Sequence, residues 1–108
     1  MRDGQNKKKL DELLALCHKN LKSVDEGLIK RAFDFSLTAH KKDLRASGEP
    51  FFNHPFEVAV IVAKEIPLDD ISVAAALMHD VAEDTDYEIK DIKQEFGATI
   101  ADIVDGAT

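Results

Sequence analysis

The chain has 108 residues, 44% of them hydrophobic, so it can bury one modest core and forms a single small domain or part of one. Its formal net charge of −7 argues against a nucleic-acid or anionic-membrane binder, because phosphate groups would repel it. The single cysteine, Cys17, excludes an internal disulfide, and neither a signal peptide nor a bilayer-spanning run is recognisable. A cytoplasmic protein is the simple expectation.

Helical periodicity dominates the first half of the chain. A first helix is predicted over residues 7–21, where Cys17 packs beside three leucines. Asp25 is suited to cap a second helix that runs to about Leu44. The inward side of this second helix is predicted to consist of Leu28, Ile29, Ala32, Phe33, Ser36, Leu37 and His40.

A glycine and two prolines interrupt the helical pattern within residues 45–55. Pro55 suits the first turn of a third helix, predicted over residues 56–66. Because a residue before proline disfavours the αR region, His54 is expected just outside this helix, with its imidazole direction fixed. A lone histidine in such a place is more often a capping or packing residue than a ligand.

A fourth helix is predicted over residues 69–84, which contain no Gly or Pro and begin with two aspartates. At 100° per residue one side is an apolar stripe, formed by Ile71, Ala74, Ala75, Met78 and Ala82. The other side is predicted to gather His79, Asp80, Glu83 and Asp84 on one helical face.

Three carboxylates crowded together repel one another, and a bound cation would explain them. A solvated helix end would account for Glu83 and Asp84 alone, but the adjacent His79 and Asp80, with His54, favour a metal site. Histidines and carboxylates suit Mn, Fe or Zn ions, whereas Ca²⁺ is poorly matched to imidazole. One cysteine is too few for a thiolate site.

The rest of the chain is predicted to be a loop at Thr85 and Asp86, a helix over residues 87–96, a stop at Gly97 and a helix over residues 98–104. The fold class is therefore an all-α bundle of about five to six helices with irregular packing. Its metal site is expected between the helix that begins near His54 and the one that ends near Asp84.

Several ordered motifs together resemble the hydrolase domain of the Rel/Spo alarmone enzymes, a branch of the HD superfamily. The motifs are RASGEP at residues 45–50, His54-Pro55, AAALMHDVAEDT at residues 74–85, Phe96-Gly97 and VDGAT at residues 104–108. The resemblance runs from about Leu28 to the last residue, and the order and spacing of the motifs make it specific.

The resemblance implies hydrolysis of guanosine 3′,5′-bis(diphosphate) and its pentaphosphate relative at the 3′-pyrophosphate, with Mn²⁺ as cofactor, in the stringent response. Fe²⁺ or Zn²⁺ could replace Mn²⁺. By position, the resemblance assigns His54, His79 and Asp80 as metal ligands, Glu83 and Asp84 to activation of the attacking water, Arg45 to the guanine base and Ser47 to a nucleotide contact. This chemistry fits general-base catalysis beside a divalent ion.

Two departures from the family pattern are expected to matter. Ala46 stands where many relatives carry a basic or polar side chain, which would weaken substrate binding. The family's fourth metal ligand is an aspartate on a later helix, so residues 1–108 are expected to be a hydrolase domain cut before that ligand, impaired or inactive alone. The synthetase and regulatory domains of the bifunctional parent are likewise expected outside these residues, with the synthetase domain as a partner in the same parent chain.

Two alternatives remain open. The chain could be another HD-superfamily phosphohydrolase for a different nucleotide, although the loop over residues 45–50 speaks against it. It could also be a regulatory module without activity, although a degenerate copy would be free to lose its costly, mutually repelling acidic groups.

Overall fold

The computed structural model describes residues 2–41, 48, 50–65, 69–85 and 87–107, without the side chains of residues 2–5 and 107. In this part of the chain it contains seven α-helices and no strand. They are α1 (Arg2–Asn20), α2 (Glu26–Ala39), α3 (Asn53–Glu65), α4 (Asp70–Met78), α5 (Val81–Asp84), α6 (Ile89–Phe96) and α7 (Ala98–Ala107). The predicted all-α class is confirmed. None of the described helices is both long enough and apolar enough to cross a membrane.

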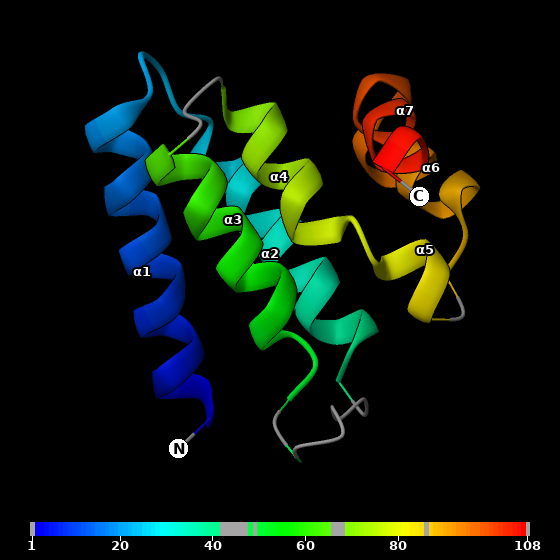
Figure 1. Ribbon diagram of the computed structural model, residues 1–108, viewed down its shortest axis with the longest axis horizontal. Coiled ribbons are helices and arrows are strands. Elements are labelled where there is room, and N and C mark those ends of the chain that lie inside the picture. The colour runs from blue at the N-terminus through cyan, green and yellow to red at the C-terminus, as the bar shows by residue number, and fades with distance from the viewer. Residues whose placement is uncertain (1, 42–47, 49, 66–68, 86, 108) are drawn as a thin grey trace.

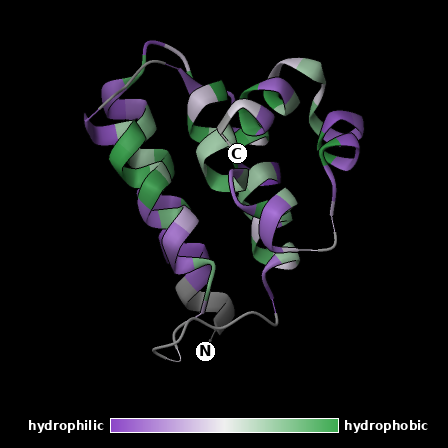
Figure 2. Ribbon diagram, turned by 45° about the vertical axis from the view of Figure 1, so that its right-hand side comes forward, coloured by the Kyte–Doolittle hydropathy of each residue, from purple (hydrophilic) through white to green (hydrophobic). Residues whose placement is uncertain are grey.

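Helix α4 is the central element of the fold. It packs against α2, α3 and α7, while α1 packs against α3. Figure 1 shows α1, α3 and α4 side by side with α2 behind them, and α5 to α7 to one side. All six residues from 73 to 78 are buried, as expected for a helix that is covered on every side. The longer helices carry both hydrophobic and hydrophilic residues, which is the amphipathic pattern of helices around a shared core (Figure 2).

Helix α2 begins as predicted. The Asp25 carboxylate accepts a hydrogen bond from the Leu28 N–H at 3.0 Å, which satisfies one of the unpaired donors of the first turn. The predicted inward residues are buried, except for the partly buried Leu37. The predicted end near Leu44 is wrong, because α2 stops at Ala39 and the chain turns at His40. His40 is buried there and stacks on Phe51 with ring centroids 4.8 Å apart.

Helix α3 begins earlier than predicted, at Asn53. The N–H groups of Asn53 and His54 donate to the carbonyls of Pro50 and Phe51, both at 3.1 Å, and these bonds start the helix before the proline. Pro55 lies in the first turn, where its missing N–H costs no helical hydrogen bond. His54 therefore stands inside the helix rather than in a loop before it.

The predicted single helix over residues 69–84 is interrupted. The His79 N–H lies 3.5 Å from the carbonyl of Ala76, three residues back, and the His79 Nδ1 lies 2.7 Å from the same oxygen. This tight turn ends α4, and α5 starts again beyond Asp80, whose carbonyl accepts from the Asp84 N–H at 2.9 Å. The prediction that one helical face carries His79, Asp80, Glu83 and Asp84 is therefore wrong.

The short helices α6 and α7 pack on each other, and α7 also contacts α4. The Glu88 N–H donates to the Asp91 carboxylate at 2.8 Å, which supports the first turn of α6. Gly97 ends α6 with a φ of 94°, a conformation that strains residues with a Cβ. The predicted stop at Gly97 is confirmed.

Cys17 is a buried packing residue on α1, as predicted. Burial raises the pKa of its thiol from 9.0 to about 11, and the nearby Asp70 carboxylate adds to the rise. Because the unfolded thiol ionises first, this contribution to stability is fully present below pH 9.0 and is lost as the pH rises to about 11.

We expect Cys17 to react with iodoacetamide at pH 8 at least about tenfold more slowly in the folded chain than in urea, because only the accessible thiolate is a nucleophile. Mass spectrometry of timed samples measures both rates. Equal rates in the folded and unfolded chain would contradict the buried placement of this thiol.

Candidate metal centre

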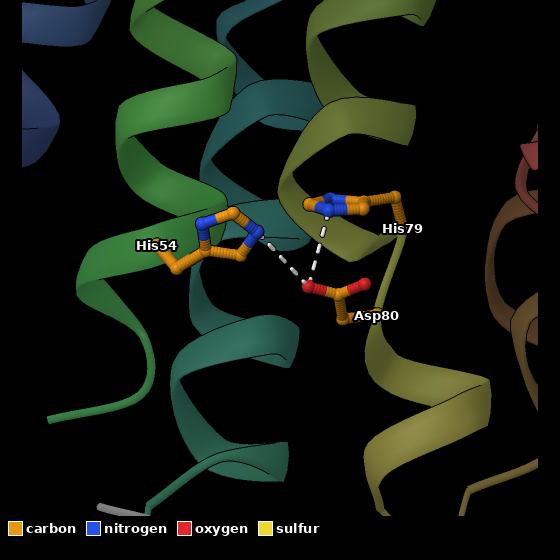
Figure 3. Close-up of side chains that lie close together, drawn as sticks. All are labelled: His54, His79 and Asp80. Carbon is orange, nitrogen blue, oxygen red and sulfur yellow. Dashed lines mark ion pairs between the residues drawn. The ribbon is translucent and has the colours of Figure 1, made fainter. Parts of the chain in front are cut away.

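Three polar side chains converge where α3 begins and α4 ends. His54 comes from the first turn of α3, His79 follows the last residue of α4, and Asp80 precedes α5 (Figure 3). The Asp80 Oδ2 lies 3.4 Å from the His54 Nε2 and 3.1 Å from the His79 Nε2. One ligand atom from each residue lies within 4.8 Å of the other two. The three predicted metal-ligating residues are thus brought together.

The packing of two neighbouring helices causes this meeting. Helices α3 and α4 run in opposite directions and are in contact, so the start of one lies beside the end of the other (Figure 1). Both helices carry buried alanines, Ala59 and Ala63 on α3 and Ala74 and Ala75 on α4. Residues 25 positions apart in the sequence therefore share one site.

The hydrogen bonding of His79 defines which of its nitrogens can bind an ion. A carbonyl oxygen can only accept, so the Nδ1 that lies 2.7 Å from the Ala76 carbonyl carries a hydrogen. In neutral imidazole the Nε2 then presents a lone pair, and this lone pair faces the Asp80 carboxylate at 3.1 Å. Two electron-rich atoms at this distance repel unless a proton or a cation lies between them.

The spacing of the donor atoms suits a cation. The imidazole rings of His54 and His79 have centroids 5.4 Å apart, and both rings direct Nε2 to the same Asp80 oxygen. Donor atoms bound at about 2.1 Å to one ion are roughly 3.0 to 3.4 Å apart, which matches the two histidine–aspartate separations. The donor set therefore fits a divalent ion such as Mn²⁺, Fe²⁺ or Zn²⁺.

The site is buried on one side and open on the other. The Asp80 side chain is 15% exposed and that of His79 is 22% exposed, whereas that of His54 is 40% exposed. The partly buried carboxylate is shielded from water, which strengthens its attraction for a cation. His54 is thus the most exposed of the three side chains.

The other predicted site residues are not part of this cluster. Glu83 and Asp84 lie on α5, directly after Asp80, and both are exposed. Arg45 and Ser47 lie outside the described residues, as does Ala46.

A groove of about 640 Å³ lies elsewhere, between α1 and α2. Leu10, Leu14 and Phe33 are among its lining residues, and none of the three metal-site residues reaches it. Its size does not make it the functional site, because the convergent polar groups that chemistry requires lie at the junction of α3 and α4.

One part of the site has no signal in the amino-acid sequence. The carbonyl that orients His79 belongs to Ala76, and any residue type could supply it. The position of the histidine at the end of a helix, three residues after that carbonyl, is the only pattern that could have indicated it.

The structure combines an all-α fold with a His-Asp pair at a helix junction and a second histidine from the neighbouring helix. These features define a class of helical metal-binding domains, and sequence comparison assigns the chain to a family of that class. The chain belongs to the HD domain family, whose model matches residues 32–108. All three residues of the metal centre lie in the matched segment.

Curated relatives confirm the resemblance to Rel/Spo proteins. Over 97 residues the chain is 38% identical to the GTP pyrophosphokinase rsh of Brucella melitensis, which covers 90% of this chain and 13% of the relative. Over 70 residues it is 51% identical to the guanosine-3′,5′-bis(diphosphate) 3′-pyrophosphohydrolase of Haemophilus influenzae, covering 65% of this chain and 10% of the relative. A GTP pyrophosphokinase of Myxococcus xanthus is 42% identical over 84 residues, 78% of this chain and 11% of the relative. The chain thus spans about a tenth of the length of these relatives.

Proposed function

We propose that this chain is the hydrolase domain of a Rel/Spo protein and removes the 3′-pyrophosphate of guanosine 3′,5′-bis(diphosphate) and its pentaphosphate relative. The convergence of His54, His79 and Asp80 on one point carries the proposal. The Haemophilus influenzae relative, 51% identical over 70 residues, bears the name of this activity.

In this proposal the cofactor is Mn²⁺, held by His54, His79 and Asp80. When bound, the ion supplies Lewis-acid activation of water and of a phosphoryl oxygen. The hydrogen bond from His79 to the Ala76 carbonyl keeps the Nε2 lone pair directed at the ion. A fourth ligand, an aspartate from sequence beyond residue 108 in a longer protein, completes the set.

Glu83 and Asp84 are proposed as the pair that orients the attacking water and takes its proton. They follow Asp80 by three and four residues in the sequence, on the short helix α5, and in this proposal they act on the water without binding the ion. Arg45 is proposed to pack on the guanine base, since a guanidinium stacks well on a purine. Ser47 is proposed to contact the nucleotide through its hydroxyl.

The proposal also includes the setting of the domain. The relatives are much longer than this chain. A synthetase domain in the same parent protein is therefore proposed as a partner. The stringent response is the proposed process, and the cytoplasm is the proposed location. The net charge of −7 makes nucleic acid an unsuitable partner, and a bound divalent ion would offset the repulsion of a phosphorylated small molecule.

The test is Mn²⁺-dependent release of pyrophosphate from guanosine 3′,5′-bis(diphosphate), measured on the 108-residue chain and on a longer form that includes the following helices. We expect turnover by the longer form and little or none by the chain alone. A folded, Mn²⁺-binding longer form that releases no pyrophosphate would favour a regulatory module. Faster turnover of a different nucleotide in a substrate panel would favour another HD phosphohydrolase.

A further inference from the structure

The turn that carries the ligand His54 is attached to α1 through a side chain. The Lys9 ammonium of α1 donates a hydrogen bond to the Asn53 Oδ1 at 2.7 Å, although the two residues are 44 positions apart. The same ammonium lies 5.6 Å from the ring centroid of Phe56. Lys9 thus holds two residues of the first turn of α3, on either side of His54 and Pro55.

The two histidines of the metal centre are held in different ways. His79 is oriented by its hydrogen bond to the Ala76 carbonyl. Among the described residues no hydrogen bond reaches the Nδ1 of His54, whose ring instead lies 6.3 Å from that of Phe51. The His79 ring lies 5.4 Å away, and this is likewise a ring contact and not a hydrogen bond, so the direction of His54 depends on how firmly its backbone turn is placed.

We infer that Lys9 positions His54 for metal binding by fixing the first turn of α3 through Asn53. The inference rests on the metal centre of the proposed function. Lys9 is not one of the three residues of the metal centre, and it lies on α1, outside the matched residues 32–108. In this inference α1 contributes to the geometry of the metal centre, although it lies outside the part of the chain that matches the HD domain family.

Removal of the Lys9 charge and removal of its hydrogen bond to Asn53 are expected to change Mn²⁺ affinity in opposite directions, which makes the inference testable. A positive charge near a cation site weakens cation binding, so removal of the charge alone would strengthen it. Loss of the hydrogen bond to Asn53 would loosen the His54 turn and weaken binding. Removing a group that orients a metal ligand commonly lowers metal affinity about tenfold or more.

The experiment is calorimetric titration with Mn²⁺ of the longer form, which includes the helices that follow residue 108. Lys9→Met keeps the aliphatic stem against Phe56 and is expected to bind Mn²⁺ about tenfold more weakly. Lys8→Met is the matched control, because it removes the same charge from an exposed neighbour on the same helix, and it should bind as tightly as the wild type or slightly more tightly. Lys9→Arg retains a donor for Asn53 and should restore most of the affinity.

A double-mutant cycle separates positioning from general support of the fold. Asn53→Ala should weaken Mn²⁺ binding as much as Lys9→Met, and the double variant should be no weaker than either, because all three lack one hydrogen bond. Asn53→Ala leaves Lys9 against Phe56, so it tests the same bond if Lys9→Met fails to fold. Thermal midpoints without metal measure the purely structural effect.

The outcomes distinguish this inference from the proposed function. Wild-type affinity in both Lys9→Met and Asn53→Ala would overturn the inference and leave the metal centre intact. Equal changes in Lys8→Met and Lys9→Met would also overturn it, since they would report charge alone. Failure of the wild-type longer form to bind Mn²⁺ would overturn both the metal centre and the inference.

Discussion

Replacement of Asp80 by alanine is expected to lower Mn²⁺ affinity more than about hundredfold and to abolish pyrophosphate release. The Oδ2 of Asp80 faces both histidine Nε2 atoms, at 3.4 and 3.1 Å, and it is the only negative charge in the three-residue cluster. Without it, two neutral imidazoles remain, which bind a hard divalent ion weakly. Loss of a ligand should exceed the ten- to hundredfold typical for loss of a group that only orients one.

Thermal unfolding provides the measurement, because an ion that binds only the folded state stabilises it. At a Mn²⁺ concentration one hundred times Kd, the wild-type chain should gain about 2.7 kcal/mol. Asp80→Ala, which binds more than about hundredfold more weakly, should gain less than about 0.4 kcal/mol at that concentration. Asp102→Ala is the matched control, since it removes an exposed carboxylate from α7 and should behave as the wild type. Equal stabilisation of Asp80→Ala and the wild type would contradict the metal centre.

Replacement of Glu83 by glutamine is expected to lower kcat by about 10² to 10⁴, the usual contribution of a general base, and to change Mn²⁺ affinity by less than about threefold. Glutamine keeps the size of the side chain but cannot take a proton from water. Glu83 is exposed on α5 and lies outside the cluster of three ligands, so the metal centre should keep its donors.

The Glu83 measurement pairs pyrophosphate release by the longer form with Mn²⁺ titration of the same protein. Glu95→Gln, the same change at an exposed position on α6, should leave both quantities unchanged. If Glu83→Gln lost as much Mn²⁺ affinity as Asp80→Ala, the separate roles of ligand and base would be wrong. An unchanged kcat would remove Glu83 from the chemistry.

The sequence alone determined the helical class and singled out the candidate metal-site residues. Apolar periodicity located most helices, because a helix that packs on a core must repeat its apolar residues every three to four positions. The Asp25 cap and the Gly97 stop were also predictable, since both depend on the chemistry of one residue type. His54, His79 and Asp80 were recognisable as a set from residue types and motif order.

Only the tertiary structure decided how these residues meet. The antiparallel contact of α3 with α4 joins His54 to the His-Asp pair, and the turn at His79 and Asp80 replaces the continuous helix that periodicity predicts. The hydrogen bond of Lys9 to Asn53, across 44 positions, has no sequence signature. Local propensity acts over a few neighbouring residues, whereas the placement of ligands depends on packing between segments that are distant in the chain.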